Sequence, residues 1–296
     1  ALILPEHALE ARGQSHGLVV VGGSPRSGTT LLQSILCSAP GTTPMMAECA
    51  PLRFLLESCQ KTVGHTKVNP GDYFDGKQGV VRFYTALCKH FLNDVRARHD
   101  ANVAVLKEPA MGSSLPLLLD IVPDALIIAI ARDPRSIVLS MREWGRRSRD
   151  RGADSHFESA TTAELAEEVA NAYRQLTRLP AEFVGDRIFF LRYEDIVHEP
   201  LWTSRVLAAV TGLDLSNYNP SAGWDVAKMG FGSGTPRDDA KTPLYGKKVA
   251  ATRVSAWRTD LAPEDIAEIE EVASFYMSLF GYEKAGLQEE ACENPD

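Results

Sequence analysis

A glycine-rich turn near the start of the chain carries the residues best suited to bind an anion. Gly23 and Gly28 are separated by four residues, follow a valine-rich apolar run, and precede a helical pattern that begins at Thr29. Small residues let the backbone curl so that several N–H groups face one point, and a helix N-terminus adds partial positive charge. The pattern therefore predicts a phosphate-binding loop, to which Arg26 adds a cation.

This turn departs from the nucleotide-hydrolase loop at one position. Thr29 stands where that loop has the lysine that acts with magnesium on the β and γ phosphates of a nucleotide. The change disfavours ATP or GTP hydrolysis. It favours a ligand with less charge at this end, such as a 5′-phosphosulfate, whose sulfate carries a single negative charge. A purely structural glycine-rich turn is the alternative interpretation.

A second candidate anion site follows another apolar run. Arg132 comes directly after residues 125–131, and Ser140 lies eight residues later, on the helix that Pro134 introduces. Arginine holds a phosphate through two parallel N–H bonds, and a serine hydroxyl adds a third contact. Taken alone, a salt bridge between Arg132 and Asp133 is the more common arrangement, so this element gains weight only together with the first loop.

Apolar runs alternate with helical patterns along the chain, which predicts an α/β fold. Short continuous apolar runs, typical of buried parallel strands, lie at residues 17–23, 103–107, 125–131 and 187–191. Helices are expected at residues 29–38, 80–98, 134–144, 162–179, 200–210 and 263–280, whereas residues 39–75 read as irregular. We predict one three-layer α/β/α domain over residues 17–284, with a central parallel sheet as in P-loop nucleotide hydrolases.

Four segments fall outside this alternation. Residues 1–16 are polar and predict a flexible lead-in, and residues 285–296 form an acidic tail. Residues 145–160 are charged and glycine-containing, and residues 214–251 are long and rich in glycine and proline. Both predict lid or acceptor loops, with simple solvated connections as the alternative.

Composition limits the classes of partner. With 31 Lys and Arg against 39 Asp and Glu, the net charge of -8 argues against a broad nucleic-acid binder. No apolar run is long enough for a membrane span, and neither the five cysteines nor the acidic residues show a metal-ligand spacing. The chain as given favours a cytoplasmic protein, but it begins at Ala1 rather than Met, so a removed leader is left open.

Three segments together resemble the sulfotransferase superfamily, whose members take a sulfuryl group from 3′-phosphoadenosine 5′-phosphosulfate (PAPS) and release 3′-phosphoadenosine 5′-phosphate (PAP). Residues 26–32, Arg-Ser-Gly-Thr-Thr-Leu-Leu, closely resemble its 5′-phosphosulfate loop, and residues 131–140 its 3′-phosphate element. Residues 191–195 are similar to a strand-end tyrosine-acid segment that would lie near the adenine. The resemblance implies donor contacts from Arg26, Ser27, Gly28, Thr29, Thr30, Leu31, Arg132, Ser140 and Tyr193, and from Lys247 and Arg253 before Trp257.

The resemblance also implies the catalytic groups. Cytosolic sulfotransferases have a histidine two residues after a lysine that follows the second strand, whereas this chain has Lys107-Glu108-Pro109. The pattern looks more like the Golgi-type branch, including tyrosylprotein and heparan sulfate enzymes, with a catalytic glutamate some 20 residues beyond the loop. Glu48 fits that position and is the predicted general base, with Glu108 as the second candidate. Lys107 and Arg26 are expected to hold the transferring group, without a metal.

The predicted function is PAPS-dependent transfer of a sulfuryl group, by in-line displacement, to a hydroxyl of a small molecule, glycan or peptide. Apolar neighbours such as Met45 predict that the Glu48 carboxylate is partly withdrawn from water. Two alternatives stay open: a P-loop-type phosphotransferase or nucleotide hydrolase, and a catalytically inactive nucleotide-binding module. The basic run Arg142, Arg146, Arg147, Arg149 and Arg151 is interpreted as a solvated face, with attraction of an acidic acceptor as the alternative.

Overall fold

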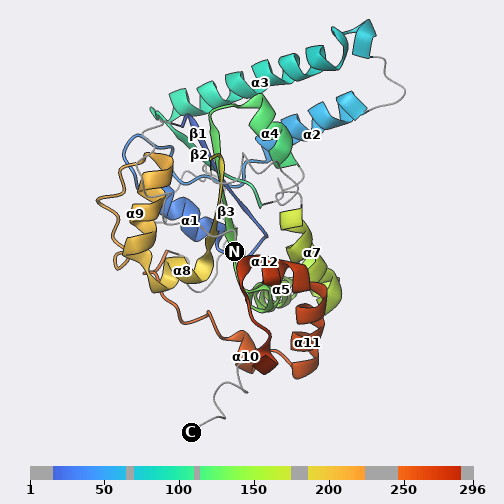
Figure 1. The fold of residues 1–296 in the computed structure, drawn as a ribbon, viewed down its shortest axis with the longest axis vertical. Helices are drawn as coiled ribbons and strands as arrows, with labels where there is room; N and C mark the ends of the chain where they lie inside the picture. Colours follow the sequence, from blue (N-terminus) through green and yellow to red (C-terminus); the bar gives the residue numbers. More distant parts are fainter. Residues whose placement is uncertain (1–15, 65–69, 110–113, 175–185, 224–245, 288–296) are drawn as a thin grey trace.

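A parallel β-sheet forms the centre of the fold. The computed structural model describes residues 16–64, 70–109, 114–174, 186–223 and 246–287 (Figure 1). Within these residues the sheet has four strands in the order β2-β1-β3-β4, all parallel. Their bounds are β1 (Leu18–Gly23), β2 (Ala104–Lys107), β3 (Ala125–Ala131) and β4 (Ile188–Arg192).

The strand register brings the carboxyl ends of the strands to one edge. Val21 pairs with Lys107, Gly23 pairs with Ile130, and Ala131 pairs with Arg192. Every residue of β1, β2 and β3 is buried, as expected for parallel strands that are covered on both faces. The predicted phosphate loop, Lys107, Arg132 and Tyr193 therefore all leave the sheet at the edge where α/β proteins bind ligands.

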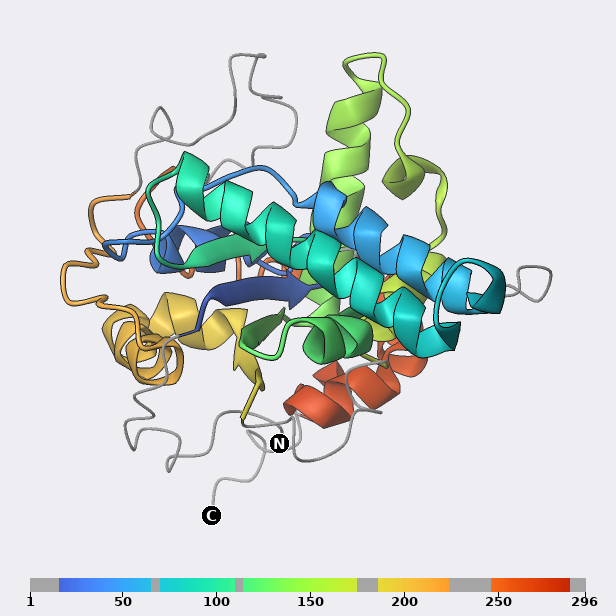
Figure 2. The same cartoon turned by 90° about the horizontal axis from the view of Figure 1, so that it is seen from above.

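Helices cover both faces of the sheet (Figures 1 and 2). One hydrophobic cluster packs Val19 and Val21 of β1 against α1 (Thr29–Leu36), α8 (Tyr193–His198) and α9 (Pro200–Thr211). A second cluster packs Leu18 and Val20 against helices of the opposite face. These helices are α2 (Ala50–Gly64), α3 (Gly76–Arg98), α4 (Leu115–Ile121), α5 (Pro134–Arg149), α7 (Thr162–Arg174), α11 (Pro263–Val272) and α12 (Ser274–Phe280).

The other described helices are short: α6 (His156–Ser159), α10 (Trp257–Asp260) and the 3₁₀ turns η2 (Pro70–Asp72) and η7 (Ala285–Leu287).

An aromatic cluster fixes α7 and α12 on the sheet. The Tyr173 ring lies 4.9 Å from that of Tyr276 and 5.2 Å from that of Phe280, and Phe190 of β4 lies 5.6 Å from Phe280. Such pairs contribute roughly 0.5–1.5 kcal/mol each beyond their buried area.

The predicted α/β fold with a central parallel sheet is confirmed, but three local predictions are wrong. Residues 39–75 contain α2, so this segment is not irregular throughout. Residues 145–149 continue α5 and residues 156–159 form α6, so the expected loop shrinks to the residues between them. The helix expected over residues 263–280 is interrupted at Ala273, where α11 ends and α12 begins.

The remaining domain predictions fall partly outside the described residues. Residues 1–15, 224–245 and 288–296 lie outside them, and the described parts of 214–251 contain neither helix nor strand. Among the described helices, none combines the length and the apolar character needed to cross a bilayer.

Candidate active site

The glycine-rich turn has a backbone that only particular residues tolerate. Gly23 and Gly28 have φ of +137° and +108°, and a Cβ atom at Gly28 would come within 2.6 Å of the Tyr193 ring. Arg26 itself has φ of +68°, a conformation that non-glycine residues adopt at a cost. The Ser27 N–H and Oγ both donate to the Ser24 carbonyl, which closes the turn.

Two buried tyrosines hold the strand ends around this turn. The Tyr173 hydroxyl accepts from the Ser24 N–H at 3.1 Å and donates to the Ile130 carbonyl. The Tyr276 hydroxyl accepts from the Arg132 N–H at 2.9 Å and donates to the Arg132 carbonyl at 2.7 Å. Burial raises the pKa of Tyr173 to about 12 and raises that of Tyr276 well above its ordinary value, so both hydroxyls stay protonated and keep donating.

The N-terminus of α1 completes the anion cradle. The N–H of Leu32 donates to the Gly28 carbonyl, and no side chain in the described residues caps this helix end. The amides of the first turn have no acceptor within the helix, as at every helix start. The amides of Thr29, Thr30 and Leu31 are therefore available to a bound anion, whereas the Ser27 N–H is already bonded to the Ser24 carbonyl.

Two arginines and a serine meet beside this helix start. Arg132 Nη1 donates to the Arg26 carbonyl at 3.2 Å, and Arg26 Nε donates to Ser140 Oγ at 3.4 Å. Arg26 Nη2 and Arg132 Nε are buried and have no hydrogen-bond partner among the described residues. Burial, followed by the charges of Arg147 and Arg132, lowers the pKa of Arg26 to about 10. The site thus gathers positive charge and leaves donors unsatisfied.

Arg132 does not pair with its neighbour Asp133, which answers the question that the sequence left open. The Asp133 carboxylate caps α5 by accepting from the Arg135 N–H at 2.9 Å, and it also binds the Arg135 guanidinium. The Arg132 guanidinium instead lies over the Tyr193 ring, 4.4 Å from its centre. Gly28, Arg132 and Tyr193, predicted as donor contacts, therefore lie together.

Lys107 links the loop to the predicted base. Its Nζ donates to Thr30 Oγ1 at 3.4 Å and to Glu48 Oε1 at 3.3 Å. Glu48 reaches this place because residues 43–49 run beside β2: the Thr43 N–H donates to the Val103 carbonyl and the Cys49 N–H to the Lys107 carbonyl. The prediction that apolar neighbours withdraw the Glu48 carboxylate from water is wrong, because the Glu48 side chain is 57% exposed. The Lys107 side chain is 11% exposed.

The second candidate base has a different environment. Glu108 is buried, its N–H donates to the Val21 carbonyl, and its carboxylate lies 3.7 Å from Arg53 Nε of α2. An ion pair inside the protein holds this carboxylate in place. Of the two candidates, Glu48 is therefore the carboxylate that is exposed and paired with Lys107.

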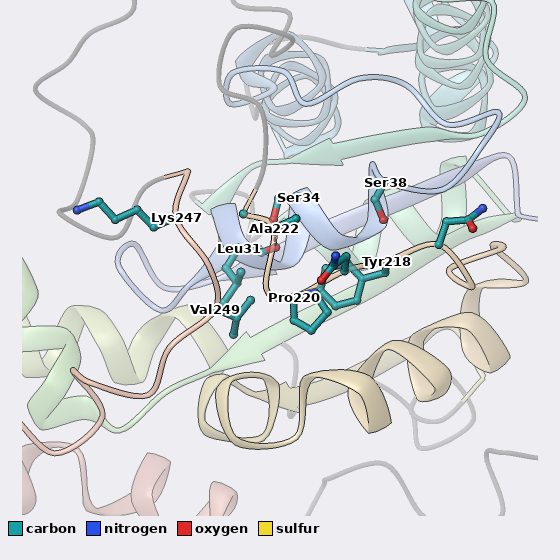
Figure 3. A pocket seen from close by; sticks show the side chains of 11 residues that line it. Leu31, Ser34, Ser38, Tyr218, Pro220, Ala222, Lys247 and Val249 are labelled. Carbon is teal, nitrogen blue, oxygen red and sulfur yellow. Dashed lines mark hydrogen bonds between the residues drawn. The ribbon is translucent and has the colours of Figure 1, made fainter.

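The two C-terminal basic residues are placed differently from each other. The Arg253 carbonyl accepts from Arg132 Nη2 at 3.4 Å, while its guanidinium binds Glu143 and lies 3.7 Å from Asp260. Lys247 is exposed at the rim of a cavity of about 270 Å³ that runs along α1 (Figure 3). Leu31 and Tyr218 line the same cavity, and the Lys247 side chain extends away from the other lining side chains.

Metal ligands are not clustered at this edge. Within the described residues, no group of three or more His, Cys, Asp or Glu side chains is arranged to hold a metal ion. The site is built instead from arginine, lysine, hydroxyl and amide donors that face a common region, which is the donor set that phosphate and sulfate groups require.

A sequence model of the sulfotransferase family matches residues 19–217, which is 199 of the 296 residues. The chain belongs to the sulfotransferase family. The match contains β1 from its second residue, β2 to β4, the loop, Lys107, Arg132, Ser140 and Tyr193, and it confirms the resemblance that these motifs indicated.

Curated relatives include two carbohydrate sulfotransferases. Mouse carbohydrate sulfotransferase 5 is 28% identical over 177 residues, covering 56% of this chain and 44% of that protein. Human carbohydrate sulfotransferase 6 is 27% identical over 185 residues, covering 59% of this chain and 46% of that protein. The chain thus spans less than half the length of these relatives. The matches agree with the Golgi-type side of the superfamily rather than the cytosolic side.

A solved structure shows the same fold. The sulfotransferase domain of the Synechococcus PCC 7002 olefin synthase superposes with a TM-score of 0.54 at 20% identity, covering 94% of this chain and 98% of that chain. This likeness concerns the fold, and it confirms the predicted P-loop-like α/β architecture.

Sequence reasoning missed three contributors to the site. Tyr173 and Tyr276 fall inside two predicted helices and belong to no predicted motif, yet their hydroxyls hold the backbone of the loop and of Arg132. Arg147 had been assigned to a solvated basic run, yet its charge acts on Arg26. Its spacing of seven residues from Ser140, which puts both on one helix face, is the signal that could have found it.

Proposed function

We propose that this chain transfers a sulfuryl group from PAPS to a hydroxyl of a carbohydrate acceptor. The observation that carries the proposal is Lys107, whose ammonium joins Thr30 of the anion loop to the carboxylate of Glu48. The carbohydrate class is supported by the relatives named carbohydrate sulfotransferases. Small molecules and peptides are the other predicted acceptors.

The residues at the strand edge fit the donor. PAPS carries anionic groups at its 5′ and 3′ ends, and the site offers two cationic elements, Arg26 with the start of α1 and Arg132 with Ser140. The buried Arg26 Nη2 and Arg132 Nε atoms lack partners among the described residues, and an anion would satisfy them. The loop glycines leave no room for a Cβ atom at Gly28, which keeps the cradle in shape.

Each catalytic group has a distinct task. PAPS, when bound, supplies the sulfuryl group, which passes to the acceptor oxygen as PAP is released. Glu48 accepts the proton of the acceptor hydroxyl at its carboxylate oxygen. Lys107 and Arg26 stabilise negative charge at the phosphate end, and the α1 amides hold the same end in place. Lys107 also positions Glu48 through their ion pair at 3.3 Å.

Calorimetric titration with PAP, ADP and magnesium-ATP tests the donor. Binding of PAP at least 100-fold tighter than either of the others, lost in Arg132→Ala, supports the proposal. Equal or tighter binding of magnesium-ATP would instead support the phosphotransferase or nucleotide hydrolase.

Glu48→Gln tests the base and the enzyme itself, with Glu108→Gln as the matched control. We expect Glu48→Gln to lower kcat by roughly 10²–10⁴-fold while PAP affinity stays within threefold, and Glu108→Gln to lower kcat less than tenfold. The reverse order would transfer the base role to Glu108. PAP binding without sulfation of any glycan, small molecule or peptide by the unaltered protein would favour the inactive binding module.

A further inference from the structure

The basic run on α5 is not a uniform solvated face. Arg142 binds Asp265 and Thr162, and Arg149 binds Glu158. Arg146 is exposed. Arg147 is half-buried, and its Nε is buried with no hydrogen-bond partner in the part of the chain that the structure describes. A desolvated guanidinium nitrogen without an acceptor is unfavourable, so Arg147 needs a specific explanation.

Arg147 faces the candidate active site. It lies seven residues after Ser140, nearly two full turns, and therefore on the same face of α5. Ser140 contacts Arg26, and Glu143, between the two, contacts Arg253. Among neighbouring charges, that of Arg147 opposes the charge of Arg26 most strongly, ahead of Arg132. Arg147 thus belongs to the same electrostatic cluster as the anion loop.

The backbone of Arg147 lies further along α5 than that of Ser140. Seven residues of helix span about 10 Å, so Arg147 lies about that far beyond Ser140. Figure 2 shows α5 standing nearly upright and rising away from the sheet. The donor's two anionic ends are already met by Arg26, Arg132, Ser140 and the α1 amides. Arg147 is an additional cation next to Arg26, beyond the groups that meet these two ends.

We infer that Arg147 forms an acceptor subsite, which binds a carboxylate or sulfate of an anionic glycan beside the hydroxyl that is sulfated. The inference rests on the proposed function, because it names the acceptor class for the same site. An anion there would satisfy the buried Nε of Arg147 and would relieve the repulsion between Arg147 and Arg26. Neutral glycans offer neither effect, so the subsite selects between glycans that share the same hydroxyls.

The test uses a chemically matched pair of acceptors. An unsulfated chondroitin oligosaccharide and its carboxyl-reduced form share their sugar backbone and differ in charge. Each is titrated calorimetrically into the PAP-saturated protein, and each is also assayed for sulfation with PAPS. We expect the unaltered protein to bind the charged form at least tenfold more tightly. Arg147→Gln should abolish that preference, Arg147→Lys should restore part of it, and Arg146→Gln, at the exposed neighbour, should leave it unchanged.

The outcomes separate this inference from the proposed function. Equal affinity for the two forms, including no binding of either, overturns the inference while PAP binding and sulfation of other hydroxyls can still stand. A fall in PAP affinity in Arg147→Gln would make Arg147 a donor contact and would also overturn it. Preference for an acidic tyrosine peptide over both glycans would overturn the glycan assignment. Failure of the unaltered protein to bind PAP would instead remove the proposed function itself.

Discussion

Arg132 and Arg135 are three residues apart and are both buried, yet their surroundings are opposite. Arg135 donates two hydrogen bonds to the Asp133 carboxylate and one to Glu270 at 2.5 Å, and its guanidinium lies 3.7 Å from the centre of the Trp257 ring. Burial lowers the pKa of Arg135, but these carboxylates outweigh it, so the net shift is upward. Arg132 has no carboxylate partner among the described residues and keeps a buried, unsatisfied Nε.

The difference shows how to separate a structural cation from a ligand-binding one. A buried guanidinium whose nitrogens are satisfied joins the elements that supply its partners, here α5 and α11. A buried guanidinium with unsatisfied nitrogens destabilises the unliganded protein until an anion arrives. Removal of the first kind should therefore change the free energy of unfolding, whereas removal of the second should change ligand affinity.

The largest expected effect is on stability. Arg135→Met leaves Asp133 and Glu270 buried without their cation, and should lower the free energy of unfolding by about 3–5 kcal/mol. Chemical denaturation measures the loss. Arg142→Met, which removes a half-exposed pair with Asp265, should cost less than about 1 kcal/mol. Similar losses in both variants would contradict the assignment of Arg135 as the structural cation.

The next effect is on donor binding. Arg132→Ala should weaken PAP binding at least 100-fold, about 2.7 kcal/mol, with little loss of the free energy of unfolding. Arg132→Lys keeps the charge but loses the fork of N–H donors, so its PAP affinity should fall between the two. Titration calorimetry and denaturation are run on the same samples. A large loss of stability with unchanged PAP affinity would place Arg132 in the class of Arg135.

At Arg26 we expect a smaller effect on the free energy of unfolding, and one that is stabilising. Because its pKa is lower in the folded protein than in the unfolded chain, the charged form is disfavoured by folding. Arg26→Gln should stabilise the unliganded protein by about 1 kcal/mol, a Tm increase of roughly 2–4 °C, while PAP affinity falls. Thermal melts should show a constant gain below pH 9 that shrinks as the pH passes about 10. A Tm decrease at pH 8 would contradict this.

The smallest effect concerns Ser140. Its hydroxyl accepts from Arg26 Nε at 3.4 Å, a long hydrogen bond. Ser140→Ala should weaken PAP binding about two- to tenfold. Ser136→Ala one turn earlier, whose hydroxyl donates to the Val254 carbonyl, is the control and should leave PAP affinity unchanged. Equal losses in both variants would mean that the serines act on the shape of α5 rather than on the donor.

The strand edge could be predicted from sequence because short-range patterns determine it. The run Leu18–Gly23 is continuously apolar and ends in the glycines of the loop, and Ala125–Ala131 leads directly to Arg132. Helix α2 was not predicted because proline, glycine and asparagine residues flank it within residues 39–75. Its buried residues Leu52, Leu56 and Cys59 follow the helical period and carried the signal.

The distinction between paired and unpaired arginines could not be predicted in the same way. Glu270, the partner of Arg135, is 135 residues away, and only the packing of α11 against α5 brings them together. Likewise, Arg142 of the basic run is paired because it bonds to Thr162 and Asp265, which lie on other helices. The Nε of Arg147 has no hydrogen-bond partner among the described residues. Charge spacing along one helix identifies cations, but the rest of the fold decides which of them remain available.

The hydroxyl of Tyr276 connects the C-terminal helices to the proposed donor site. The family match ends at residue 217, and Tyr276 lies well beyond it on α12. Its hydroxyl nevertheless hydrogen-bonds to both the N–H and the carbonyl of Arg132. The proposed donor site therefore depends on residues beyond the segment that identifies the family. A protein truncated after residue 217 would keep the motifs up to Tyr193. It would lose the Tyr276 hydroxyl, which holds the backbone of Arg132.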